Sequence, residues 1–302
     1  MAEPFIDRLI TAIRAKNSPI CVGIDPMPDK FPAELRPANP RDLMATVAAV
    51  DKFGRQVVEA VADVAPIIKL QSAYYERLLW PGVEAYYNLV TYAKSLGLLV
   101  IGDVKRGDIG ATSEAYAAAH LATPAFDSIA QTTPDAITLN PFLGMETLQP
   151  FLDVCSAEQK GVFVLVRTSN PGSKDLQDLK TDHGDTFSEH LGTLLDDLKL
   201  KIGMCGRYGY CDLGAVVGAT QIHTMAAIRT RMKQSYFLLP GYGTQGATGE
   251  MTKAAFDYRG LGAIVSASRS VLYPGREPGE TWQNAVRRAA TAMRDDLRKV
   301  IQ

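Results

Sequence analysis

The sequence predicts an α/β fold in which eight parallel strands, each followed by a helix, close into a (β/α)8 barrel, the TIM-barrel architecture. Short apolar runs recur at intervals of roughly 25 to 50 residues, and a polar or glycine-rich turn and then a helical pattern follow each run. The runs are almost continuously hydrophobic, which is typical of parallel strands covered by helices on both faces. Eight such units in 302 residues match the size of one barrel.

The expected strands are, in chain order, residues 19–25, 65–71, 98–105, 136–142, 161–169, 213–220, 236–243 and 262–270. Between them, residues 42–62 and 82–97 have the apolar spacing of helices that pack on a sheet. A doubly wound sheet is the alternative, but its first turn should carry a GxGxxG motif, which "GIDPMPDK" at 23–30 lacks. We therefore interpret residues 1–302 as a single barrel domain.

One segment is longer than a minimal barrel requires. Residues 173–212 separate the fifth and sixth expected strands and are interpreted as an insertion. The segment reads as a polar loop, an amphipathic helix near 186–201 and a second loop. Its sequence indicates no role.

Composition narrows the class of protein. The formal net charge of −1 argues against a surface for nucleic acid or anionic membranes. No apolar run approaches the roughly 20 residues of a spanning helix, and the charged start "MAEPFIDRLITAIRAK" does not resemble a secretory signal. The four cysteines lack CxxC spacing and are expected to be reduced thiols, so we expect a cytoplasmic protein.

Charged residues stand where the apolar runs end, although unpaired charge is costly in a protein core. The polar residues at the expected strand ends are Asp25, Lys69, Gln71, Asp103, Lys105, Arg167, Thr168, Ser169 and Arg269. In a (β/α)8 barrel the active site lies at the face formed by the carboxyl ends of the strands. Asp103 and Lys105 lie two apart and should share a face. With Lys69 and Asp108 they form an alternating set in which each charge can hold its neighbours ionised.

A second feature predicts a phosphate site. The loop "PGYGTQGATGE" at 240–250 follows the seventh expected strand, and Arg269 ends the eighth. This fold commonly binds phosphate there, through backbone N–H groups and a guanidinium. The glycines could also let the loop move as a lid. His183 and His190 are seven residues apart without clustered partners, so we expect no metal site.

These residues carry a resemblance to a known family. "DVKRGDIGAT" resembles the DxKxxDI signature of the orotidine 5′-phosphate decarboxylases. The blocks "CVGIDP", "IIKLQSAYYE", "ITLNPFLG", "VRTSNPGS", "LPGYGTQGAT" and "IVSASRSVLYP" also occur in the family's order. The length, with the insertion after the fifth strand, resembles the longer bacterial, type 2 subfamily.

The resemblance implies cofactor-independent decarboxylation of orotidine 5′-monophosphate (OMP) to UMP and CO2, the last step of de novo UMP biosynthesis. Lys105 would donate a proton to C6 of the pyrimidine, with Lys69, Asp103 and Asp108 completing the charged network. The implied substrate contacts are Asp25 and Lys69 with the ribose, Ser169 with the pyrimidine, and Gln245 and Arg269 with the phosphate. Asp108 and Thr112 would serve the partner's site, so a homodimer with shared active sites is expected.

Three other functions fit the sequence less well. A Mg²⁺-dependent sugar-phosphate lyase or decarboxylase of the same superfamily would place a carboxylate near the end of the second strand, where this chain has Lys69. A Schiff-base aldolase would need an unprotonated Lys105, which the flanking carboxylates oppose. A non-catalytic sensor of phosphoribosyl ligands would not require a buried lysine between two aspartates.

Overall fold

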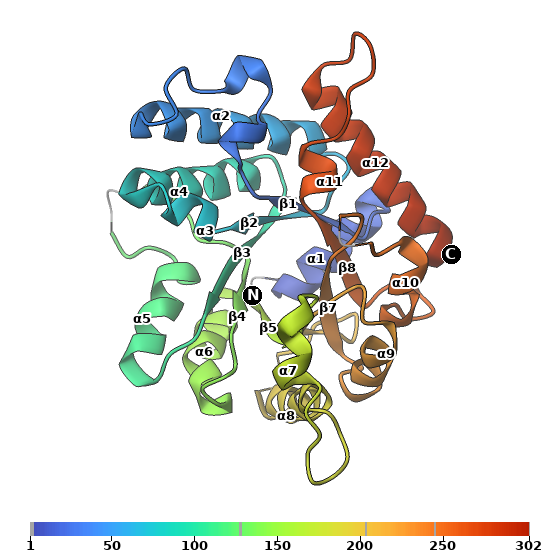
Figure 1. Ribbon diagram of the computed structural model, residues 1–302. Coiled ribbons are helices and arrows are strands. Elements are labelled where there is room, and N and C mark those ends of the chain that lie inside the picture. The colour runs from blue at the N-terminus through green and yellow to red at the C-terminus, as the bar shows by residue number, and fades with distance from the viewer. Residues whose placement is uncertain (1–2, 127–128, 203, 245, 302) are drawn as a thin grey trace.

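The computed structural model describes residues 3–126, 129–202, 204–244 and 246–301. Its eight strands are all parallel and form a closed barrel in chain order, β1 to β8 (Figure 1). They are β1 (Ile20–Ile24), β2 (Ile67–Gln71), β3 (Leu99–Arg106), β4 (Ala136–Leu139), β5 (Gly161–Arg167), β6 (Cys211–Val217), β7 (Ser235–Pro240) and β8 (Ala263–Ala267). The predicted (β/α)8 barrel is confirmed, and each strand overlaps its expected range, although most strands end two or three residues earlier than expected and Arg269 begins α11 (Arg269–Leu272).

Helices surround the barrel and occupy its rims (Figure 1). They are α1 (Phe5–Lys16), α2 (Leu43–Val61), α3 (Ala73–Glu76), α4 (Leu79–Ser95), α5 (Gly110–His120), α6 (Gln149–Glu158), α7 (Lys174–Gln177), α8 (Phe187–Ile202), α9 (Ile222–Arg231), α10 (Gly249–Thr252), α11 (Arg269–Leu272) and α12 (Trp282–Ile301). No helix in the described part of the chain is both long enough and apolar enough to cross a membrane.

The molecule has two apolar cores. The larger lies between the outer faces of the strands and the surrounding helices. The smaller fills the barrel interior, where α1 packs Phe5, Leu9 and Ile10 against inward side chains such as Ile101 and Phe163. Figure 1 shows α1 behind the strands. Because α1 covers the end of the barrel at which the strands begin, a ligand can approach the interior from the other end, where the strands finish.

The segment between β5 and β6 contains an ordinary barrel helix and two additions. The amphipathic helix expected near 186–201 is α8, which buries Leu191 and Leu195 in the larger core. The first addition contains α7 and an antiparallel bridge between Lys180 and Thr186. The second addition is the loop that leads into β6.

This second loop overturns one expectation about the cysteines. Cys205 lies antiparallel to Cys211 at the start of β6, and the two form a disulfide. The reduced state expected from the sequence is therefore wrong for this pair, because the loop folds back on the strand and brings together residues whose spacing carries no motif. Cys21 and Cys155 are buried free thiols, as expected.

Candidate active site

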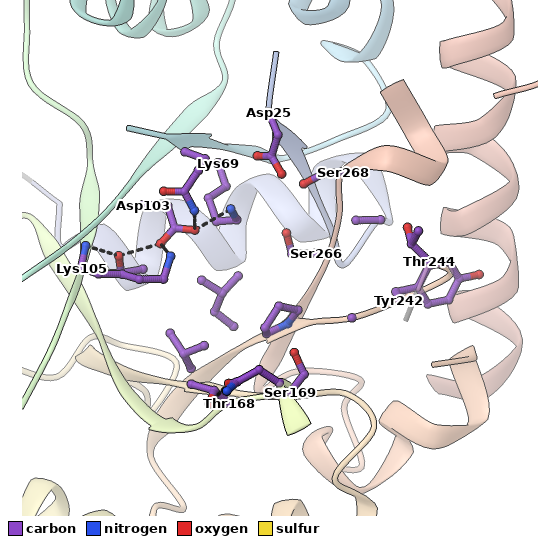
Figure 2. A pocket seen from close by; sticks show the side chains of 18 of the residues that line it. Asp25, Lys69, Asp103, Lys105, Thr168, Ser169, Tyr242, Thr244, Ser266 and Ser268 are labelled. Atoms are coloured by element: carbon purple, nitrogen blue, oxygen red, sulfur yellow. Dashed lines mark hydrogen bonds and ion pairs between the residues drawn. The ribbon is translucent and has the colours of Figure 1, made fainter. Parts of the chain in front are cut away.

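A cavity of about 340 Å³ opens at the carboxyl ends of the strands (Figure 2). Its walls come from the carboxyl ends of all eight strands, β1 to β8, and from several of the loops that follow them. Six residues that the sequence predicted for the site line this cavity: Asp25, Lys69, Asp103, Lys105, Ser169 and Arg269. The barrel thus brings together side chains that lie up to 244 residues apart, 269 − 25, in the chain.

Asp103 is the centre of the charged network. Its Oδ2 accepts hydrogen bonds from Lys69 Nζ at 2.7 Å and from Gln71 Nε2 at 3.0 Å. Its Oδ1 accepts from Lys105 Nζ at 2.5 Å and from Thr138 Oγ1 at 2.8 Å. Four donors from β2, β3 and β4 therefore fix both oxygens of this carboxylate.

Burial and charge oppose each other at this network. Burial by itself would raise the pKa of Asp103, but the neighbouring charges of Lys69 and Lys105 outweigh it and hold that pKa well below the usual range. Burial would likewise lower the pKa of Lys69, and Asp103 and Asp25 reverse this and raise it. Asp103 is therefore an ionised carboxylate that its lysine neighbours keep charged at neutral pH.

Lys105 adopts an unusual backbone conformation. Its φ of 45° lies in the left-handed region, which costs energy for a residue with a side chain. The register between β3 and β4 shifts between Gly102 and Arg106, and Thr138 Oγ1 accepts a hydrogen bond from Lys105 N–H at 3.0 Å. The two-residue alternation predicted that Asp103 and Lys105 point the same way. They do meet, but through this local distortion rather than through a regular strand.

The side chain of Lys105 is the accessible cation of the network. It is 43% exposed, whereas the side chains of Lys69 and Asp103 are each 8% exposed. Lys105 can therefore reach a ligand in the cavity while its ammonium contacts Asp103. Lys69 is enclosed and acts on the same carboxylate from the opposite side.

The other end of the cavity has the character of an anion site. Gly241, Tyr242, Thr244 and Arg269 line it, and Arg269 makes no ion pair with any described carboxylate. In Figure 2, Tyr242 and Thr244 lie at the side opposite Lys105 and Asp103. The loop is held to α12, since Tyr242 Oη donates to Asp296 at 2.7 Å. Gln245, which the sequence predicted for phosphate binding, lies outside the described residues.

Between the two ends lies a carboxylate that has spare hydrogen-bonding capacity. Asp25 follows β1, and its Oδ1 is buried without a hydrogen-bond partner among the described residues. Ser266 and Ser268 of the β8 end line the same stretch (Figure 2). Unpaired buried oxygens are costly, so this arrangement suits a ligand that brings hydroxyl donors.

Two predicted residues do not reach this cavity. Asp108 and Thr112 follow β3 but are absent from its lining, and Thr112 is exposed on α5. Asp108 Oδ1 accepts from the N–H of Ile109 at 2.8 Å. The chain turns away from the cavity at Gly107, where an added Cβ would lie 2.5 Å from the main-chain oxygen of Asn140. A single chain therefore leaves these two residues outside its own pocket.

Two members of the network were not among the predicted site residues. Gln71 ends an expected strand, but its position there does not by itself indicate a role in the site. Thr138 sits inside the apolar run "AITLNPF", where its hydroxyl looks like a neutral β-forming side chain. The available signal was that Thr138 lies on the strand that follows the one carrying Asp103 and Lys105. The sequence alone does not give the register between these two strands, and it is the register that brings Thr138 to Asp103.

Comparisons with known proteins give a consistent result. The model of the orotidine 5′-phosphate decarboxylase / HUMPS family matches residues 18–285. An orotidine 5′-phosphate decarboxylase of Clostridium perfringens is 37% identical over 299 residues, covering 98% of each chain. One from Rhodopirellula baltica is 36% identical over 302 residues, covering 97% of this chain and 99% of the relative. The structure of Leishmania donovani OMP decarboxylase superposes with a TM-score of 0.77 at 26% identity, covering 99% and 98% of the two chains.

The network makes a prediction about stability. Thr138→Val keeps the shape of the side chain but removes the donor to Asp103 and the acceptor for Lys105 N–H. We expect the free energy of unfolding in urea to fall by about 1–3 kcal/mol, because partly buried groups lose their partners. Thr193→Val on the exposed face of α8 is the control. Equal unfolding free energies for the two variants would contradict the network.

Proposed function

The chain belongs to the orotidine 5′-phosphate decarboxylase / HUMPS family, and we propose that the charged cavity is where it acts on its substrate. The protein is a carboxy-lyase that decarboxylates OMP to UMP and CO2 in pyrimidine biosynthesis. The observation that carries the proposal for the site is the Lys69–Asp103–Lys105 network, which lies across the cavity from an anion-binding end. That separation matches a substrate with a carboxylated ring at one end and a phosphate at the other.

The proposed pose follows from the cavity. The phosphate lies against Arg269 and the backbone of the loop at 241–244, where Gln245 would add a contact. The ribose hydroxyls donate to the unpartnered oxygen of Asp25. The pyrimidine then lies between Ser169 and Lys105, with its carboxylate near Asp103. The phosphate contacts are remote from the reacting bond, so their binding energy can align the ring against the network.

The chemistry begins as the bond between C6 and the carboxylate breaks. CO2 leaves without the electron pair, which stays on C6. Lys105 stabilises this carbanion and transfers one proton from Nζ to C6, giving UMP and a neutral amine that regains its proton from solvent. Asp103 repels the substrate carboxylate, and the repulsion ends when CO2 departs.

The size of the repulsion between Asp103 and the substrate carboxylate shows why Lys105 is needed as well. Two unit charges 4 Å apart interact by about 4 kcal/mol at an effective dielectric constant of 20. If fully realised, this repulsion accounts for about three powers of ten in rate, which is well short of typical enzymatic accelerations of about a millionfold or more. The larger share therefore falls to Lys105, which acts on charge that develops only in the transition state.

The runner-up reaction does not fit the cavity as well. A Mg²⁺-dependent sugar-phosphate lyase or decarboxylase would have a carboxylate at the end of β2. This chain has Lys69 there, with its ammonium 2.7 Å from Asp103. CO2 release from OMP, measured with and without EDTA, separates the two reactions, and we expect the rate to be the same in both.

We propose in addition that the enzyme is a homodimer with shared active sites. Asp108 and Thr112 lie outside their own cavity, and exposed apolar side chains gather on the loops and helices after β2, β3 and β4. These are Leu79, Trp80, Ile109, Phe142 and Leu143. An apolar rim beside the cavity fits contact with a second copy, which could bring its Asp108 and Thr112 to this site. We also propose a cytoplasmic location, which the biosynthetic role of the family supports and the disulfide between Cys205 and Cys211 does not.

Lys105→Ala is expected to lower kcat for CO2 release by three or more powers of ten, because the proton donor is lost. Affinity for UMP should stay within about tenfold of the wild type, since the phosphate end is unchanged. Lys233→Ala, an exposed lysine just before β7 at the opposite end of the barrel, is the control. Turnover of the Lys105 variant within tenfold of the wild type would rule out this proton donor.

A mixed dimer tests the shared site. Lys105→Ala and Asp108→Asn should each be nearly inactive alone. After the two are unfolded together and refolded in equal amounts, random pairing should give mixed dimers in which one site carries both lesions and the other carries none. About a quarter of wild-type sites should then return. Recovery near zero, with mixed dimers verified by mass spectrometry, would show that Asp108 serves its own chain.

A further inference from the structure

The segment after β5 is built around a buried arginine that does not face the cavity. Arg167 ends β5 and is 4% exposed. Its guanidinium donates to the main-chain oxygen of Thr168, to the hydroxyl of Ser173 and to Asp178 at 3.1 Å. These contacts fold the chain back on itself, so that α7 lies against the end of β5.

Gln177, the last residue of α7, extends this contact to the cavity wall. Its Oε1 accepts a hydrogen bond from Thr168 N–H at 2.8 Å, and its Nε2 donates to Thr168 Oγ1 at 3.0 Å. Thr168, Ser169 and Asn170 all line the cavity. Figure 2 shows Thr168 and Ser169 along one side, between the Lys105 end and the Tyr242 end. The side chain of Gln177 therefore holds both the main-chain N–H and the hydroxyl of Thr168, the first residue of this wall.

Gln177 is itself fixed to the outer layer of the barrel. Its main-chain oxygen accepts a hydrogen bond at 3.0 Å from the hydroxyl of Ser188, which is fully buried. Phe187 N–H donates to the oxygen of Leu179 at 2.7 Å. Both donors belong to the first turn of α8, whose apolar face packs in the larger core. A continuous chain of contacts thus runs from α8 through Gln177 to the cavity.

We propose that Gln177 is a positioning residue, which holds the wall formed by Thr168, Ser169 and Asn170 in place for the pyrimidine ring. This proposal rests on the proposed function, since it takes the ligand to be a pyrimidine nucleotide with its ring at this wall. It gives the first part of the 173–212 insertion a role in recognising the base. Gln177 does not reach the phosphate end, which is built from other loops.

The test compares two ligands that differ in the base. Gln177→Met keeps the length of the side chain and removes both hydrogen bonds to Thr168. Calorimetry with UMP should show binding about tenfold weaker than in the wild type, as expected for the loss of two hydrogen bonds. Binding of ribose 5-phosphate, which has no base, should change by less than about twofold. KM for OMP should rise by more than kcat falls.

Two further variants complete the test. Gln177→Glu can still accept from Thr168 N–H and from its hydroxyl, so it should restore most of the UMP affinity. Lys174→Ala, on the exposed side of the same short helix, should bind both ligands as the wild type does. Equal weakening of UMP and ribose 5-phosphate by Gln177→Met, or no weakening at all, would overturn the positioning role. Failure of the wild type to release CO2 from OMP would instead contradict the proposed function.

Discussion

A carboxylate enclosed between two lysines is the constraint on which the rest of this site depends. Asp103 is buried, and a buried charge is tolerated only when it is paired and fully hydrogen-bonded. Four donors from three adjacent strands meet that demand. One of these contacts fixes the position of the Lys105 ammonium, and the backbone of Lys105 is left-handed at the same place, beside the register shift between β3 and β4. The conformational strain and the buried charge thus lie at the same few residues, as expected of a site built for reaction rather than for stability.

The barrel converts this local arrangement into an oriented pocket. Because α1 closes the end of the barrel at which the strands begin, a ligand enters from the carboxyl face. There it contacts residues from several strands at once. The charged network and the loop at 241–244, which we propose binds the phosphate, lie on opposite sides of the cavity (Figure 2). In the proposed pose, a substrate held at its phosphate places its carboxylate against Asp103. Binding energy from the phosphate end is then available to offset the repulsion at the reacting end.

Periodic features of the sequence predicted the fold and placed most of the candidate site residues at strand ends, whereas the roles of these residues came from the resemblance to the family and stay predictions. Apolar runs at regular intervals mark the strands, and charges at their ends mark the rim. The remainder depends on contacts that have no periodic signal. The register that brings Thr138 to Asp103, the left-handed turn at Lys105 and the contact of Gln177 with Thr168 follow from packing. The pairing of Cys205 with Cys211 likewise needs the path of a loop. The place of Asp108 in a partner's site requires a second chain and stays a prediction.

The central claim is that the charge of Asp103 opposes the substrate carboxylate, and Asp103→Asn tests it most directly. The variant removes the charge and keeps the shape. The account predicts that kcat for OMP falls by at least tenfold while KM for OMP also falls, because OMP no longer meets a like charge in the ground state. Affinity for UMP, which lacks the carboxylate, should change little. An unchanged or raised KM for OMP, or a retained kcat, would contradict the account.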